Sequence, residues 1–311
     1  MSKNPPLVSI MIPTYNRAMR LKCAVESALN QTYPKIEILI SNNSSSDETG
    51  SYLKQINNQI ITSFHQEKNI GLINNWNFLL DKAAGEYCLM LSDDDELDAD
   101  AIANLMQVVF DFERDFGGNN IGVVVGLSNI SKKNEGEESN IFLEVTCKKL
   151  MQLIFRDELQ VLPSATLLKT SVAQKKGYKN HYGAAIDLGL IVDLSKDDAH
   201  ALVLNKMVCQ YSIHEGNITA KFNVDEIFKT YSRLLKGVRQ DKALKRVNDA
   251  HFLSVMKRIL TYVISERFAN GKLTFKNSMV CIYKYRWYFE LFDFPSIVIK
   301  MILKRILKYR F

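Results

Sequence analysis

Residues 87–98 read YCLMLSDDDELD, so that a short apolar run leads directly into three consecutive aspartates. The run from Tyr87 to Leu91 has the length and the residue types of a buried strand. Adjacent carboxylates at a strand end repel one another and are costly to desolvate. A divalent cation offsets that cost, because Mg²⁺ and Mn²⁺ take oxygen ligands and share them with substrate phosphates. A solvated acidic loop is the alternative interpretation.

Upstream of this stretch, strand and helix patterns alternate along the chain. Apolar runs that predict strands cover Leu7–Ile12, Ile36–Ile40 and Ile60–His65. Between them, helical spacing is carried by Leu21, Val25, Ala28 and Leu29, by residues 48–57, and by Trp76, Leu79 and Leu80. This alternation predicts an α/β fold in which a mostly parallel sheet carries helices on both faces. Further on, residues 165–168 predict either a sheet-edge strand or part of an acceptor side.

Three polar clusters follow three of the predicted strands. They are Thr14–Arg17, Asn42–Asp47 and Asp93–Asp95. In open α/β sheets, ligands bind beyond the carboxyl ends of the strands. We therefore expect the three clusters to converge on one site.

The composition argues against a secreted, a disulfide-rich and a membrane-spanning protein. The 311 residues suffice for one large α/β domain with a helical appendage, and the net charge of +6 is modest. The five cysteines are scattered without a CxxC pair, which predicts neither a zinc site nor a disulfide framework and favours a reducing cytoplasm. No secretory signal and no uninterrupted run of about 20 apolar residues is visible. We expect a cytoplasmic protein, soluble or peripheral on the inner face of the cell membrane, with no nucleic-acid partner.

The pattern changes near residue 222. Helical periodicity dominates from there, which predicts one domain over residues 1–222 and a helical region over 223–311. Near the end, Lys300, Lys304 and Lys308 share one helical face opposite an apolar stripe. A basic amphipathic helix suits an anionic membrane surface. The alternative is a helix packed on the first domain with its lysines in water.

Four motifs, in this order and spacing, resemble family 2 glycosyltransferases, which have the Rossmann-like GT-A fold and an inverting mechanism. The motifs are VSIMIPTYNR (8–17), ALNQTYPKIEILISNNSSSDET (28–49), NIGLINNWN (69–77) and YCLMLSDDDELD (87–98), the last corresponding to the family's DxD element. The resemblance covers roughly residues 7–220. It implies a nucleotide-sugar donor, with a UDP-sugar the first expectation, and a divalent metal, Mn²⁺ or Mg²⁺.

Carried over by position, the resemblance also implies roles for individual residues. Pro13, Thr14, Tyr15 and Arg17 would line the nucleotide pocket. Asn42 stands where the family has an aspartate that contacts the base, and an amide accepts hydrogen bonds less strongly than a carboxylate. Asp93 and Asp94 would lie at the ribose or metal shell, and Asp95 would bind the metal. Two further departures are Trp76, where many relatives carry a basic residue, and Ser212, which replaces an arginine.

Two later segments match the family's remaining site elements. Residues 211–219, YSIHEGNIT, resemble the element whose histidine completes the metal shell, which assigns His214 beside Asp95, against a structural or merely exposed histidine. Residues 183–190, GAAIDLGL, fall at the general-base motif and assign Asp187, which would accept the proton of the attacking hydroxyl. Asp193, Asp197 and Asp198 compete for that role, and Asp187 itself has the alternative of a helix cap or salt bridge.

The resemblance as a whole implies an inverting transferase of the kind used in bacterial surface-polysaccharide assembly. It would move a hexose or similar sugar from a nucleoside diphosphate to a hydroxyl of a glycan or lipid-linked glycan. Two alternatives remain open from the sequence. One is a non-catalytic module that binds sugar or nucleotide, and the other is a membrane-associated scaffold in a polysaccharide complex.

Overall fold

The structure is a computed structural model that describes most of the first two thirds of the chain. The described residues are 5–117, 120–131, 142–155, 159–183, 185–197 and 199–214, with a few single positions beyond. The chain divides into two compact units, one of residues 1–180 with 186–214 and the other of residues 181–185 with 215–311. The predicted domain boundary at residue 222 and the basic C-terminal helix lie outside the described residues and stay predictions.

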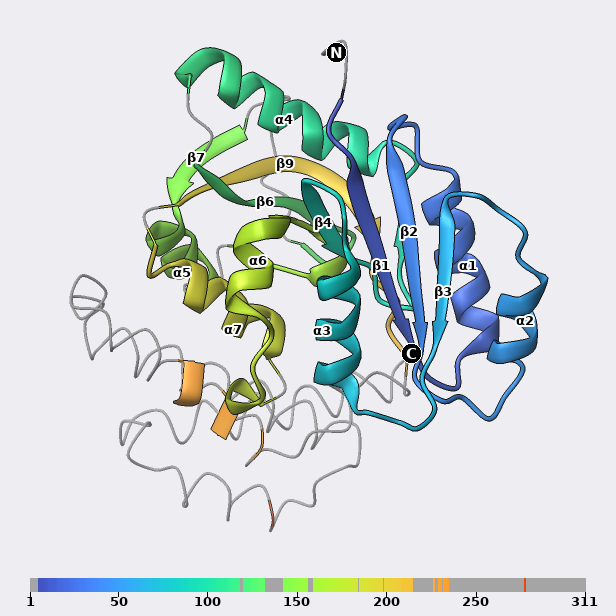
Figure 1. Cartoon of the computed structure of the whole chain (residues 1–311). Helices are drawn as coiled ribbons and strands as arrows, with labels where there is room; N and C mark the ends of the chain where they lie inside the picture. The colour runs from blue at the N-terminus through green and yellow to red at the C-terminus, as the bar shows by residue number, and fades with distance from the viewer. Residues whose placement is uncertain are drawn as a thin grey trace, which may run out of the picture. The chain divides into compact units, whose positions relative to one another are not determined.

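The first unit is built on one sheet of nine strands (Figure 1). Their order is β3-β2-β1-β4-β8-β6-β9-β5, and β7 pairs with β9. The strands are β1 (Val8–Thr14), β2 (Ile36–Asn42), β3 (Ile61–His65), β4 (Tyr87–Met90), β5 (Glu96–Leu97), β6 (Ile121–Ser128), β7 (Phe142–Thr146), β8 (Thr166–Lys169) and β9 (His200–Gln210). The first four in the order pair parallel, and β9 pairs parallel with β6. The prediction of a mostly parallel sheet is confirmed.

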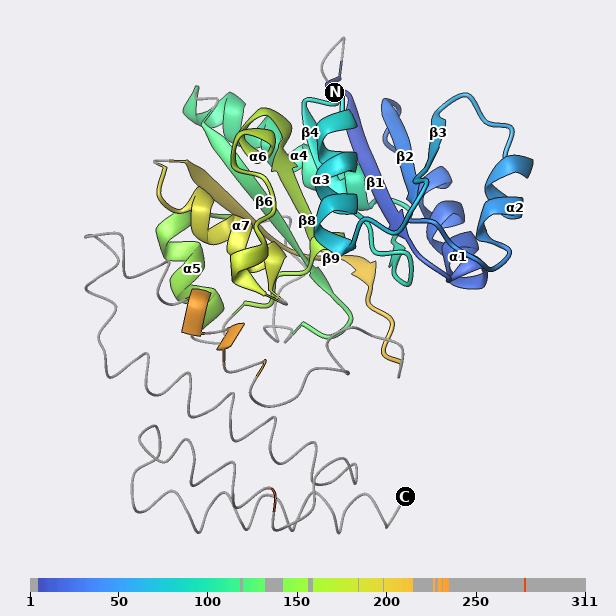
Figure 2. The ribbon, with the colours of Figure 1, turned by 60° about the horizontal axis from the view of Figure 1, so that its bottom comes forward.

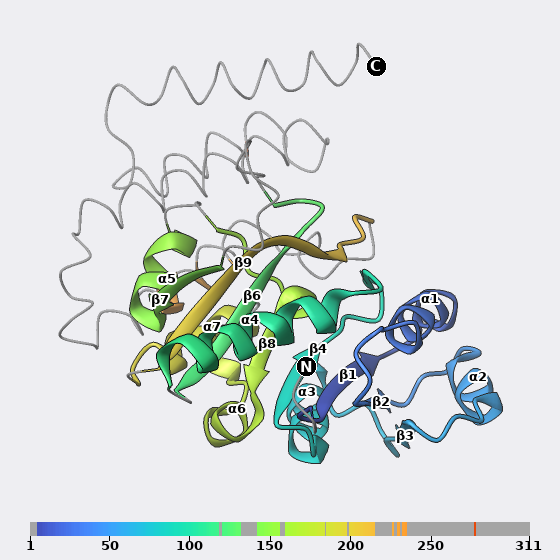
Figure 3. The ribbon, with the colours of Figure 1, turned by 90° about the horizontal axis from the view of Figure 1, so that it is seen from above.

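Helices cover both faces of this sheet. They are α1 (Ala18–Leu29), α2 (Thr49–Gln55), α3 (Leu72–Lys82), α4 (Ala101–Phe116), α5 (Cys147–Phe155), α6 (Thr170–Lys176) and α7 (Ile186–Leu194). Figures 2 and 3 show α1 and α4 along one face of the sheet and α3 and α6 along the other. Val8, Ile10 and Ile12 share a buried cluster with residues of α1 and α4. Since side chains alternate along a strand, β1 contributes to the core on both faces.

The sequence misplaced one strand and left others unpredicted, of which β9 is the longest. The apolar run at 165–168 forms β8, which lies inside the sheet between β4 and β6 and pairs antiparallel with both, so it is not a sheet-edge strand. The eleven-residue β9 was not predicted. Its pairing with β6 contains several register shifts, and these disrupt the regular alternation that identifies a strand from sequence.

None of the helices that the structure describes is long and apolar enough to cross a membrane.

Candidate active site

The loops that follow β1 and β2 are joined at the carboxyl edge of the sheet. The Asn43 N–H donates to the Thr14 carbonyl over 2.9 Å. The Asn16 N–H donates to Ser45 Oγ over 2.9 Å, and Asn16 Oδ1 accepts from the Ser46 N–H over 2.8 Å. Asn16 has a φ of 54°, a left-handed conformation that asparagine adopts more readily than most residues. Two of the three predicted polar clusters therefore meet.

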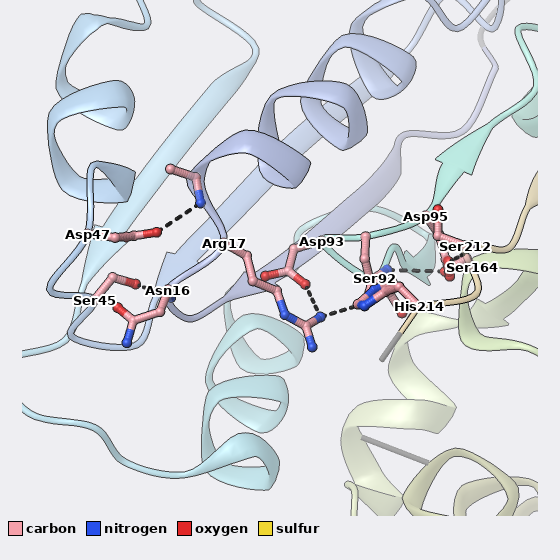
Figure 4. A network of polar contacts seen from close by, with 12 residues as sticks. Asn16, Arg17, Ser45, Asp47, Ser92, Asp93, Asp95, Ser164, Ser212 and His214 are labelled. Atoms are coloured by element: carbon pink, nitrogen blue, oxygen red, sulfur yellow. Dashed lines mark hydrogen bonds and ion pairs between the residues drawn. The ribbon is translucent and has the colours of Figure 1, made fainter. Parts of the chain in front are cut away.

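Asp47 ties the second loop to the start of α1 (Figure 4). Its Oδ2 accepts from the Ala18 N–H and its Oδ1 accepts from the Thr49 N–H, each over 3.0 Å. Burial acts to raise the pKa of Asp47, but hydrogen bonds from Thr49 and Ala18 outweigh it and the pKa lies below its usual value. Asp47 thus serves as an N-cap acceptor for a helix to which it does not belong, and it fixes the backbone next to Arg17.

Arg17 joins the third cluster to the other two. Its Nη1 lies 2.9 Å from Asp93 Oδ1 and 2.6 Å from Asp94 Oδ2. Burial raises the pKa of Asp93, while the Arg17 charge and the Thr14 hydroxyl act against that rise. All three polar clusters therefore converge on one edge of the sheet, as the sequence predicts.

His214 reaches the same place from the end of β9. Its Nε2 lies 3.0 Å from Asp94 Oδ2, which is the oxygen that also accepts from Arg17. The sequence paired His214 with Asp95, whereas the structure places the imidazole against Asp94. One carboxylate oxygen is therefore the point where a guanidinium and an imidazole from distant parts of the chain meet.

Asp95 is turned towards neutral partners. Its Oδ2 accepts from Ser164 Oγ over 2.7 Å and its Oδ1 accepts from the Ser212 N–H over 3.1 Å. Only 2% of Asp95 is exposed, and burial raises its pKa to about 6 although the hydrogen bonds from Ser164 and Ser212 lower it. Ser164 belongs to the short 3₁₀ helix η1 (Pro163–Ala165) and also accepts from the Ser92 N–H over 3.1 Å. Sequence reasoning missed Ser164, because its spacing carries no signal of these contacts.

The remaining nucleotide-pocket residues divide into buried and exposed ones. Pro13 and Thr14 are buried in β1, while Tyr15 is 46% exposed at the rim. Asn42 is buried, its Oδ1 accepts from the Ser45 N–H over 2.9 Å, and its Nδ2 lies 3.3 Å from His65 Nδ1. Its amide therefore organises the loop after β2, and the predicted base contact of Asn42 stays a prediction.

Asp187 lies in the first turn of α7 and lines a small apolar pocket that is partly open to solvent. The other lining residues are Met90, Val161, Pro163, Thr166, Leu168, Tyr178, Leu190 and Ile191. Burial raises the pKa of Asp187 to about 6, opposed by hydrogen bonds from the N–H groups of Leu188 and Asp187 itself. The pocket adjoins the acidic turn, since Pro163 lines it and the next residue, Ser164, binds Asp95.

The competing aspartates are held in ion pairs. Asp193 is 3% exposed, and its carboxylate oxygens lie 2.7 Å from Lys179 Nζ and 2.6 Å from Lys196 Nζ. Asp197 lies 2.9 Å from Lys176 Nζ. Asp198 is outside the described residues. These pairs give Asp193 and Asp197 structural partners and favour Asp187 among the described candidates.

The described part of the chain brings together no group of three or more His, Cys, Asp or Glu side chains that would hold a metal ion by themselves. At the carboxyl edge of the sheet, the His214 imidazole is in direct contact with the Asp94 carboxylate.

Comparison with known proteins identifies the family. A model of the family described as Glycosyl transferase family 2 matches residues 9–174, which is more than half of the chain. The chain belongs to this family. This family 2 chain is a glycosyltransferase, as the four sequence motifs imply, and its sheet has the GT-A arrangement.

Relatives and solved structures agree with that identification. The chain is 27% identical, over 247 residues and 78% of each chain, to the GalNAc(5)-diNAcBac-PP-undecaprenol beta-1,3-glucosyltransferase of Campylobacter jejuni. It is 35% identical to the putative colanic acid biosynthesis glycosyl transferase WcaA of Escherichia coli over 96 residues, 30% of this chain and 34% of that one.

Among solved structures, Staphylococcus aureus TarS 1–349 in complex with UDP-GlcNAc aligns over 97% of this chain and 89% of its own, with a TM-score of 0.64 and 15% identity. The mannosyltransferase PcManGT of Pyrobaculum calidifontis, in complex with GDP-Man and Mn²⁺, aligns over 98% and 88% with a TM-score of 0.58 and 14% identity. At identities of 14–15%, the likeness to these two structures shows a shared fold and nothing more.

Proposed function

We propose that this family 2 glycosyltransferase takes its sugar from a nucleoside diphosphate donor, with a UDP-sugar as the first candidate, at the rim where Arg17, Asp94 and His214 meet. The observation that carries the proposal is the shared oxygen Asp94 Oδ2, which lies 2.6 Å from Arg17 Nη1 and 3.0 Å from His214 Nε2. Three loops and the end of β9 converge there. Solved neighbours in complex with UDP, UDP-GlcNAc and GDP-Man support a donor of this class.

The side chains at this point fit a divalent metal. Carboxylate oxygens and an imidazole nitrogen are ligands that Mn²⁺ takes, and such ions are commonly held by one or two carboxylates together with substrate phosphates. Asp94 and His214 would hold the ion, with Asp93 beside them. Asp95, which the sequence assigned to the metal, has its two oxygens hydrogen-bonded to Ser164 and Ser212, and this favours Asp94 as the direct ligand. When bound, the metal would supply charge that stabilises the departing diphosphate.

Arg17 and Tyr15 are the residues that would bind the donor nucleotide. Arg17 contacts two carboxylates, and its side chain is still 23% exposed. It therefore presents positive charge at the surface where a diphosphate would lie. Tyr15 is exposed beside it and offers an aromatic face to a nucleotide. The proposed base contact of Asn42 is supported by the resemblance alone.

Asp187 is the proposed general base. A carboxyl with a pKa of about 6 is mostly ionised at neutral pH and still basic enough to accept a proton. The acceptor hydroxyl oxygen would form a bond to the anomeric carbon as its proton moves to the Asp187 carboxylate. The bond from that carbon to the diphosphate oxygen breaks in the same step, and its electron pair leaves with the nucleoside diphosphate. A single displacement of this kind inverts the anomeric centre.

The proposed acceptor is a glycan or a lipid-linked glycan. The support is the Campylobacter jejuni relative, whose name specifies an undecaprenol-linked acceptor and whose match covers 78% of both chains. Such an acceptor fits a cytoplasmic enzyme that binds peripherally to the inner face of an anionic membrane through the basic residues 300–308.

The experiment is a thermal-shift screen of nucleotide sugars with and without Mn²⁺, followed by measurement of nucleoside diphosphate release. Ligand binding to the native state raises its melting temperature. We expect Mn²⁺-dependent shifts of the melting temperature in the wild type. Asp94→Asn and His214→Ala should reduce these shifts, whereas Asp187→Asn should keep them and lose nucleoside diphosphate release. Asp111→Asn, at a half-buried position of α4 whose carboxylate pairs with Arg114, is the matched control and is expected to behave as wild type. Absence of release with every common donor would leave a non-catalytic binding module instead.

A further inference from the structure

His214 is carried by a short segment of residues 211–214 that follows β9 and has no regular secondary structure. A backbone without helix or sheet partners must find its hydrogen bonds elsewhere. The segment's first two residues bind side chains from two different loops. The way these loops hold the segment decides where the imidazole of His214 lies.

The first anchor is Asn129, which directly follows β6. Its Nδ2 donates to the Tyr211 carbonyl over 3.1 Å, and its Oδ1 accepts from the Tyr211 N–H over 2.8 Å. One side-chain amide thus pairs with both backbone groups of one residue, as a neighbouring strand would. Of the common side chains, only Asn and Gln offer a donor and an acceptor in this arrangement.

The second anchor is Asp95, whose Oδ1 accepts from the Ser212 N–H over 3.1 Å. Asn129 itself sits in a defined turn, because the Ser131 N–H donates to the Ser128 carbonyl over 2.9 Å and the Ser128 N–H donates to Ser131 Oγ over 3.0 Å. The segment is therefore held at two successive residues by two fixed loops. Since one residue spans at most about 3.6 Å, the Cα of His214, two residues on, lies within about 7 Å of the Ser212 anchor.

We infer that Asn129 is a positioning residue for His214. By clamping the Tyr211 backbone it aligns the segment so that Asp95 receives Ser212 and the His214 imidazole reaches Asp94 Oδ2 at 3.0 Å. The effect of this clamp on metal binding rests on the role proposed above for His214. The clamp itself is a statement about the position of the segment and is testable without any ligand.

The first test is hydrogen–deuterium exchange of a peptide that contains Tyr211 and Ser212, with no metal or donor present. Asn129→Ala removes both hydrogen bonds and is expected to raise exchange at these two amides by roughly 10-fold, since exposed segments open locally at low free energy. Asn129→Asp keeps the acceptor for the Tyr211 N–H and should give a smaller increase. Unchanged exchange in Asn129→Ala would refute the clamp.

A matched control comes from α4, where Asn104 bonds a side chain of β9. Asn104 Oδ1 accepts from Lys206 Nζ over 3.0 Å, so Asn104→Ala also removes a long-range side-chain bond to β9. That bond lies away from the 211–214 segment. Asn104→Ala should leave the exchange of Tyr211 and Ser212 at the wild-type rate, and an equal increase there would mean that any loss of a bond to β9 loosens the segment.

The second test is a double-mutant cycle of Asn129→Ala with His214→Ala, read out as Mn²⁺ binding by electron paramagnetic resonance in the presence of UDP or GDP. Loss of an outer partner of a ligand weakens metal affinity by about 10-fold or more, and we expect roughly 10-fold for Asn129→Ala alone. In the His214→Ala background Asn129→Ala should weaken binding no further, because its effect passes through the imidazole.

The outcomes separate the two claims. Independent, additive losses would show that Asn129 acts by another route and would overturn the inference. If His214→Ala leaves Mn²⁺ binding unchanged, the metal role in the proposed function fails, while the exchange result still decides whether Asn129 holds the segment.

Discussion

At the scale of single residues, the site is a cluster of carboxylates whose charge is balanced by few partners. Arg17 contacts Asp93 and Asp94, whereas Asp95 has hydrogen bonds from a hydroxyl and an N–H group. Burial raises the pKa of both Asp93 and Asp95. The protein therefore holds acidic groups in a buried place where their charged form is less stable than in water. Such shifts of pKa are common at functional sites.

Arg17→Ala should destabilise the protein at neutral pH. It leaves two largely buried carboxylates without their cation, and loss of one partner of a mostly buried pair costs about 3 kcal/mol in the free energy of unfolding. The loss should shrink as the pH falls and Asp93, whose pKa burial raises, becomes protonated. Urea denaturation at pH 7 and pH 4.5 measures both effects. Arg114→Ala, which breaks exposed pairs with Asp111 and Asp115, is the control and should change little.

The transfer rate should depend on the ionisation of Asp187. As general base this group must be deprotonated, and its pKa is raised to about 6. We expect kcat to rise with pH through an apparent pKa near 6 and to level off above pH 7. Single-turnover transfer between pH 5 and 8, with the donor saturating, measures this limb. A rate that is flat across that range would remove Asp187 from the role of base.

Asp187→Asn should stabilise the protein while it abolishes transfer. The pKa of the Asp187 carboxyl is about 6 in the folded protein, against an ordinary value of 3.8. Between pH 3.8 and 6 the native state therefore binds more protons than the unfolded state. The native carboxylate therefore destabilises the fold increasingly as the pH rises from about 4 to 6, by roughly 1–3 kcal/mol. The gain in melting temperature of Asp187→Asn should be full at pH 7 and absent near pH 3.5. Equal gains at both pH values would contradict this account.

At the scale of elements, the start of α1 depends on another loop. The helix follows Arg17, no side chain caps it from within, and Asp47 accepts the Ala18 N–H from the loop after β2. The sequence places Asp47 in a polar cluster but does not reveal this contact. Capping across loops leaves no pattern at the three-residue spacing by which local caps are recognised.

Asp47→Ala should lower stability and loosen the donor side together. Loss of an N-cap acceptor costs about 1 kcal/mol in the free energy of unfolding. Because the cap adjoins Arg17, weaker donor binding should accompany it. Urea denaturation and donor titration give the two readings, with exposed Asp81→Ala in α3 as control. A loss of stability with unchanged donor affinity would separate the cap from the position of Arg17.

The elements also show what sequence patterns reveal. The strands β1 to β4 and the helix α3 follow regular apolar spacing and were predicted. The position of β8 was not, because nothing in residues 165–168 tells which strands it joins. The convergence of the acidic turn with Arg17 follows from strand order, whereas Ser164 and Asn129 act through contacts that only the folded chain defines.

At the scale of the whole molecule, β6 and β9 hold the second half of the sheet together through a tight contact. Gly126 in β6 faces the Val208 side chain of β9, which would clash with any Cβ at position 126. A glycine inside a strand weakens that strand, and here it permits the close approach of its neighbour.

Gly126→Ala should lower the free energy of unfolding by roughly 1–3 kcal/mol, as overpacking does. Val208→Ala in the same chain removes the clashing methyl groups and should recover part of the loss. Urea denaturation of the single and double variants tests this. Additive losses in the double variant would show that the two residues do not interfere.

The interior position of β8 has a consequence for synthesis of the protein. One edge of β4 can pair only after residue 169, the last residue of β8, has been synthesised. By then β4 itself was made about 80 residues earlier. Until then the nascent chain presents unpaired apolar strand edges at both β4 and β6, and such edges attract other chains. We therefore expect the nascent chain to be most prone to aggregation between the synthesis of β6 and that of β8.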